Sequence, residues 1–124
     1  MTLELLKNEY SVYKFNPEYI INRNIQTEEF ISITKTKHEL SIVAQINSFN
    51  DFIKAENGWR ILKIRGTLDF SLIGVLSKIS TILACENISI FVISTYNTDY
   101  IMIKDENIAL AIEVLSKNEY QVME

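Results

Sequence analysis

The fold is decided by residues 59–99, which read WRILKIRGTLDFSLIGVLSKISTILACENISIFVISTYNTD. The first part, Trp59 to Arg65, is rich in apolar and β-branched residues and predicts a strand. Residues 66–74, GTLDFSLIG, form the turn that follows, and apolar residues then recur with helical spacing. Strand, loop and helix therefore follow one another from Trp59.

The predicted helix runs from about Phe70 to Glu86, and its apolar stripe comes from side chains three and four positions apart. These are Leu72, Val75, Leu76, Ile79, Ile82 and Leu83. Two further runs with apolar residues, Ile88–Ile93 and Asp99–Lys104, are separated by the polar stretch STYNT, which predicts a β-hairpin.

The last part of the chain supplies one more helix and one more strand. Asp105 is a candidate N-cap for a helix with Ile108, Ala111, Ile112 and Leu115 on one face. Lys117-Asn118 closes this helix, and Tyr120–Met123 predicts a short final strand. The order β-α-β-β-α-β is the ferredoxin-like order of an α+β fold. Right-handed crossovers place its first strand beside the third, with both helices on one face.

The first half of the chain predicts a shortened version of the same series. Its strands are expected at about 9–15, 30–36 and 40–45. A short helical turn after Pro17 and a short helix over 47–55 are expected between them, because Pro suits a first helical position and Phe49, Phe52 and Ile53 have helical spacing. Asn57-Gly58 is a terminating pair. We therefore expect an abbreviated unit over residues 1–58 and a complete unit over 59–124.

Composition narrows the possible functions. One cysteine, Cys85, and one histidine, His38, provide neither an internal disulfide nor a zinc ligand set, and we expect no metal or other cofactor. The formal net charge is -4, and no basic cluster indicates nucleic-acid binding. No apolar run is long enough to span a membrane. These features predict a cytoplasmic protein without nucleic-acid or membrane partners.

Two turns carry the polar groups that could bind a ligand. The predicted helix start offers free N–H groups and a partial positive charge, which suit a carboxylate. Gly74 in its first turns either lets a ligand approach or permits close helix packing. The hairpin supplies hydroxyl and amide groups and the Asp99 carboxylate, so the two turns together could hold the zwitterion of a free α-amino acid. The alternative is that Asp99 caps the neighbouring helix and the other residues only form the turn.

Three segments resemble small proteins built from two ACT-like units without an enzyme domain. The segments are Trp59–Ile64, Leu68–Leu76 and Ile93–Tyr100. ACT domains are ferredoxin-like modules that usually bind amino acids at an interface between units, through the first strand-helix loop. By this resemblance, the ligand site would consist of the loop residues Asp69, Phe70, Ser71 and Gly74 and the hairpin residues Ser94, Thr95, Asn97, Thr98 and Asp99.

The resemblance implies a non-catalytic amino-acid sensor or regulatory module. The alternative is an ACT-like structural or protein-interaction module that has lost its ligand site. A phosphatase of the acylphosphatase type is disfavoured, because Thr67-Leu68-Asp69 stands where an anion-binding arginine is required. Because the first half is too short to form a full partner site, we expect a homodimer.

Overall fold

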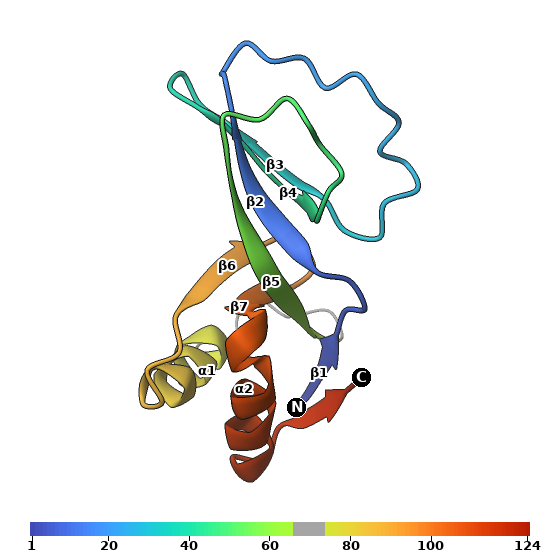
Figure 1. Cartoon of the computed structure of the whole chain (residues 1–124). Coiled ribbons are helices and arrows are strands. Elements are labelled where there is room, and N and C mark those ends of the chain that lie inside the picture. The colour runs from blue at the N-terminus through green and yellow to red at the C-terminus, as the bar shows by residue number, and fades with distance from the viewer. Residues whose placement is uncertain (66–73) are drawn as a thin grey trace. The chain divides into compact units, whose positions relative to one another are not determined.

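The computed structural model of the chain describes residues 1–65 and 74–124. Two compact units are present (Figure 1): unit 1 comprises Met1–Lys7 and Trp59–Glu124, and unit 2 comprises Asn8–Gly58. The elements in chain order are β1 (Thr2–Leu5), β2 (Tyr10–Phe15), β3 (Ser32–Lys35), β4 (Leu40–Gln45), β5 (Lys54–Ile64), α1 (Val75–Ala84), β6 (Ile90–Ser94), β7 (Asp99–Lys104), α2 (Asp105–Lys117) and β8 (Gln121–Met123).

Unit 1 is a ferredoxin-like α+β unit. Its strands lie in the order β6-β7-β5-β1-β8, so β5 is beside β7, as the crossover rule predicts. Both helices pack on one face of this sheet. Their buried residues Ile79, Leu83 and Leu115 share a core with the strand residues Leu62 and Ile101. The fold class predicted from the sequence is therefore confirmed.

The position of β1 was not predicted. β1 runs antiparallel to β5, with Leu3 opposite Ile64, and parallel to β8, with Leu3 opposite Val122. In the predicted series the last strand would lie directly beside the first, but β1 occupies that place. Leu3 is fully buried in the core of unit 1, and this burial holds the first strand of the chain there.

The helix boundaries differ from the predictions. α1 begins at Val75, and Gly74 before it has a φ of 85°, which a helix cannot continue through. The predicted helix start near Phe70 lies outside the described residues. Asp105 is the first residue of α2, and the N-cap position belongs to Lys104. The Asp105 carboxylate instead lies 3.5 Å from Nη1 of Arg60.

Unit 2 has its predicted strands but neither predicted helix. β2 pairs with β4 and β4 with β3, the latter two forming a hairpin whose tip carries the exposed His38. Residues 47–55 were predicted to be helical, but residues 47–53 form turns and irregular backbone, and β5 begins at Lys54. Ser48 closes one of these turns, because its hydroxyl donates to the Gln45 carbonyl at 2.5 Å. The segment after Pro17 is likewise a turn.

Aromatic packing replaces the missing helices in unit 2. Phe15, which is fully buried, stacks on Tyr19 with ring centroids 4.3 Å apart and meets Phe49 edge to face at 5.4 Å. The Arg23 guanidinium lies 4.9 Å from the centre of the Phe49 ring, donates to the Ser48 carbonyl at 2.9 Å and pairs with Glu28. Loop residues thus cover the apolar strands without helices.

The raised pKa of Tyr10 makes the free energy of unfolding of the protein depend on pH. Burial, aided by the Glu29 and Glu28 carboxylates, raises its pKa from 10.0 to about 12. Above pH 10 the unfolded chain releases this proton while the folded chain keeps it, so stability is full below pH 10 and is lost as pH rises towards 12. We expect the free energy of unfolding to fall by about 1 kcal/mol more in the wild type than in Tyr10→Phe between pH 9 and 11. Urea titrations measure this difference.

The control for Tyr10→Phe is Tyr96→Phe, because the Tyr96 side chain is exposed. Its pH dependence should match that of the wild type. If Tyr10→Phe also loses stability as the wild type does, the shifted titration does not belong to Tyr10.

Candidate functional site

The hairpin between β6 and β7 forms one part of the predicted site. Ser94 and Asp99 are paired across the two strands. The turn between them is closed by Thr95, whose backbone N–H and hydroxyl both donate to the Thr98 carbonyl, at 2.8 and 2.9 Å. Tyr96 and Asn97 at the tip are exposed. The Thr95 hydroxyl is therefore engaged in the turn, whereas the tip residues face solvent.

Thr98 attaches this hairpin to the end of β5. It is buried, and its hydroxyl donates to the Ile64 carbonyl at 3.0 Å. Without the Thr98 hydroxyl, the buried Ile64 carbonyl would lose this hydrogen bond, which costs free energy. The bond holds the hairpin tip at the end of β5, where the loop towards α1 begins, and it indicates a positioning role for Thr98.

Asp99 faces the helix-covered side of the sheet. Alternation along β7 places it on the same face as Ile101 and Ile103, which are both buried in the core with the helices. Within the described part of the chain, its carboxylate has no hydrogen-bond or ion-pair partner. No amide in the described first turn of α1 donates to it, so capping of α1 finds no support there.

Gly74 directly precedes α1 and is exposed. A Cβ added to it would meet no described atom within 4 Å, so close packing does not explain the glycine. The φ of 85° at Gly74 explains why a glycine is found here, because other residues rarely adopt that conformation. A side chain here is expected to strain the start of α1 by about 1–2 kcal/mol.

Three predicted site residues, Asp69, Phe70 and Ser71, lie outside the described residues. The structure therefore places six of the nine predicted residues. Five of these belong to the hairpin, and the sixth, Gly74, lines a hollow beside α1, none of whose described lining residues belongs to the hairpin.

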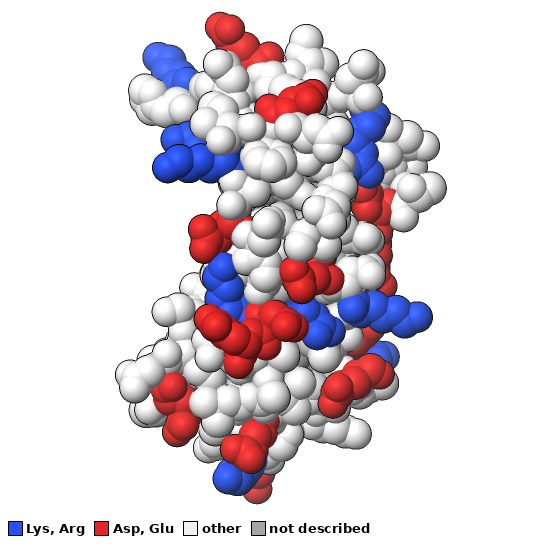
Figure 2. Space-filling model, in the orientation of Figure 1, with Lys and Arg blue, Asp and Glu red and all other residues white. Residues whose placement is uncertain are grey.

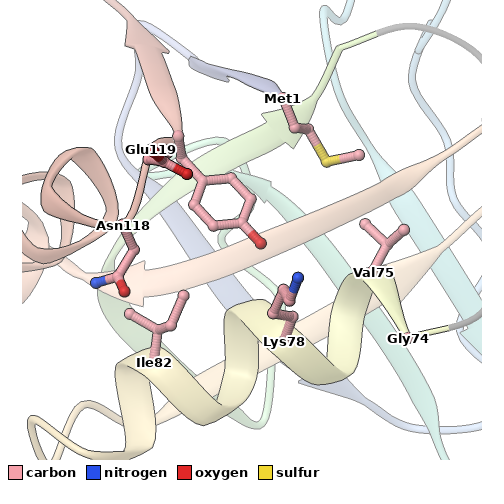
Figure 3. Close-up of a pocket in the computed structure, with 8 residues that line it drawn as sticks. Met1, Gly74, Val75, Lys78, Ile82, Asn118 and Glu119 are labelled. Carbon is pink, nitrogen blue, oxygen red and sulfur yellow. The ribbon is translucent and has the colours of Figure 1, made fainter.

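This hollow has a volume of about 700 Å³ (Figure 3). Its walls come from the start of the chain, from α1 and from the segment that joins α2 to β8. The described lining residues are Met1, Gly74, Val75, Lys78, Ile82, Asn118, Glu119 and Tyr120. Lys78 projects from α1 into the hollow, on the same side as Val75.

The end of α2 places one wall of the hollow. Glu119 has a φ of 70°, and the Tyr120 N–H donates to the Leu115 carbonyl at 3.1 Å, which is a Schellman ending. The Asn118 amide also donates to the Val114 carbonyl at 2.7 Å. The turn therefore holds residues 118–120 in one conformation.

Charges of both signs are interspersed on the face shown in Figure 2. Among the residues that the structure describes, no group of three or more His, Cys, Asp or Glu side chains is arranged to hold a metal ion. None of the helices in the described ranges has both the length and the apolar character needed to cross a membrane.

Comparison with protein families gives two adjoining matches. The ACT domain family matches residues 54–117, which is about half of the chain. A separate family, described as an N-terminal domain, matches residues 8–51. The two matches divide the chain close to the boundary between its two compact units.

Two named relatives are similar to this chain over about half of its length. The cytosolic arginine sensor for mTORC1 subunit 1 from Homo sapiens is 36% identical over 62 residues, which are 49% of this chain and 19% of the sensor. The same protein from Bos taurus matches equally. This chain therefore aligns with about a fifth of the length of these relatives.

Solved structures resemble nearly the whole chain. A crystal structure of an Agobacterium tumefaciens protein has a TM-score of 0.88 and 25% identity, covering 98% of this chain and 91% of that one. A Vibrio cholerae protein of unknown function, described as a possible transport protein, has a TM-score of 0.69 at 19% identity, covering 94% and 88%. The aspartokinase α and β subunits have a TM-score of 0.64 at 16% identity, covering 94% and 96%; these last two show the fold alone.

Proposed function

The chain belongs to the ACT domain family, and from this premise we propose that it is a non-catalytic regulatory module that binds a free α-amino acid. The ligand site in this proposal consists of the hairpin residues Ser94, Thr95, Asn97, Thr98 and Asp99 together with Gly74 and the preceding loop residues Asp69, Phe70 and Ser71. The protein would act in the cytoplasm.

The observation that carries the proposal is the position of Asp99. Its carboxylate lies on the helix-covered face and has no partner among the described residues. The Thr98 bond to Ile64 fixes the hairpin at the end of β5. A ligand ammonium at Asp99 would complete a charge-assisted hydrogen bond. The arginine sensor adds support, because this relative is named for sensing an amino acid.

The test is a thermal-shift screen with each of the twenty amino acids, arginine included. A ligand at about 100 times its dissociation constant stabilises the folded state by roughly 2.7 kcal/mol. For a chain of this length, that raises the melting temperature by several degrees. If no amino acid moves the midpoint at millimolar concentration, the alternative of a structural or protein-interaction module replaces this proposal.

We also propose that the protein is a homodimer, since unit 2 has no helices with which to form a second complete ACT-like site. Light scattering at micromolar protein concentration, with and without the stabilising amino acid, measures this state. A monomer under both conditions would contradict dimerisation and leave the amino-acid screen to stand by itself.

A further inference from the structure

We propose that the hollow beside α1 is a second binding site, which shares Gly74 with the proposed amino-acid site but none of its hairpin residues, and that it takes a small aliphatic carboxylate. The carboxylate would lie at Lys78, with the Tyr120 hydroxyl as a further donor, and the aliphatic part against Val75 and Ile82. This proposal does not depend on amino-acid binding at Asp99.

The size and lining of the hollow suit such a ligand. Its volume of about 700 Å³ lies within the usual range of small-molecule pockets. Val75 and Ile82 stand on the same side of α1 as Lys78 and are half-buried, so an aliphatic chain could cover them.

Lys78 is the group in the hollow that would hold a carboxylate. In the described ranges, no carboxylate lies within ion-pair distance of Lys78, whose amino group points into the hollow. Gly74, which precedes α1, and Val75, its first residue, also line the hollow at the positive end of that helix. One lysine is a point charge, which suits a single carboxylate better than a phosphate held by a cluster.

Glu119 would distinguish two kinds of ligand that carry this carboxylate, an amino acid and a simple fatty acid. It also lines the hollow and has no ion-pair partner in the described part of the chain. An aliphatic amino acid would present its ammonium to Glu119, whereas a simple fatty acid would not. Leucine and 4-methylpentanoate share the carboxylate and the branched chain and differ in the ammonium, so their comparison distinguishes the sources.

The experiment is a titration of ¹⁵N-labelled protein with leucine and, separately, with 4-methylpentanoate, followed by amide chemical shifts. At least one of them should shift the amides of Gly74, Val75, Lys78 and residues 118–120. Lys78→Met should weaken that binding about tenfold or more, through loss of a charge-assisted bond. Shortening the acid by one methylene should weaken it about threefold.

Matched variants keep the result interpretable. Lys78 is exposed on α1 and Met is a good helix former, so Lys78→Met should fold with an unchanged melting temperature. Lys37→Met, at the exposed β3–β4 turn, should bind as the wild type does. Asp99→Asn should leave these shifts intact, whereas it should remove shifts that belong to the hairpin.

Two outcomes would overturn the proposal. One is that neither acid shifts the amides around the hollow at millimolar concentration. The other is that Lys78→Met binds as tightly as the wild type. Shifts confined to Ser94–Asp99 count with the first outcome and support only the hairpin site.

Discussion

Asp99→Asn is expected to weaken the binding of the stabilising amino acid about tenfold or more while the fold remains intact. The substitution keeps the size of the side chain but removes the negative charge that would face the ligand ammonium. A hydrogen bond to a charged group contributes roughly 1.5–3 kcal/mol, which sets the size of the effect. Calorimetric titration of wild type and variant with the same amino acid measures it.

The control is Asp51→Asn, an exposed carboxylate in unit 2, which should bind as the wild type does. Asn accepts the same N–H bonds as Asp, so a helix-capping role predicts no loss of affinity in Asp99→Asn. Wild-type affinity in the variant would remove Asp99 from the site and transfer the proposal to Asp69, Phe70 and Ser71.

Phe15→Ala is expected to lower the stability of unit 2 by about 3–5 kcal/mol. The Phe15 ring is fully buried between Tyr19 and Phe49, and its loss would leave a cavity in a core that no helix covers. A unit of this length has little stability to spare. Urea unfolding followed by the near-ultraviolet circular dichroism of the tyrosines measures the change.

Phe91→Ala provides the comparison. Phe91 lies on β6 in unit 1, is 37% exposed and touches Trp59 with ring centroids 6.0 Å apart. Its truncation should cost less, about 1–2 kcal/mol, because more than a third of its area stays in contact with water and its burial is only partial. Equal losses in the two variants would mean that the aromatic cluster of unit 2 is not its core.

The spacing of apolar residues along the sequence predicted the elements of unit 1 well where that spacing continues over a whole strand or helix. β7 and α2 were predicted at Asp99–Lys104 and from Asp105 to Lys117, because each has an uninterrupted apolar period. Residues 47–55 were predicted wrongly for a physical reason. Phe49 and Phe52 have helical spacing, but both rings pack on Tyr13, at 5.3 Å in each case, and this tertiary packing outweighs the local preference.

Other features lay beyond the reach of local pattern. The pairing of β1 with β5 and β8 joins residues from opposite ends of the chain, and nothing in the sequence around Leu3 indicates it. The hollow beside α1 could not be predicted for the same reason, because its walls come from segments that are far apart in the sequence. Local pattern does not single out Lys78 either, because an exposed lysine on a helix is ordinary.

The pairing of β1 with β5 determines where unit 2 is joined to unit 1 in the chain. The two strands are antiparallel neighbours, and the Leu6 N–H donates to the Ile61 carbonyl at 2.9 Å, so β1 and the second part of β5 form a hairpin. Asn8–Gly58, the whole of unit 2, occupies the position of its turn. Hairpin turns tolerate insertion because their two ends already lie together. Both ends of unit 2 therefore join unit 1 at one turn, and we expect a variant with a two-residue Asn-Gly link in place of Asn8–Gly58 to keep the β1–β5 pairing.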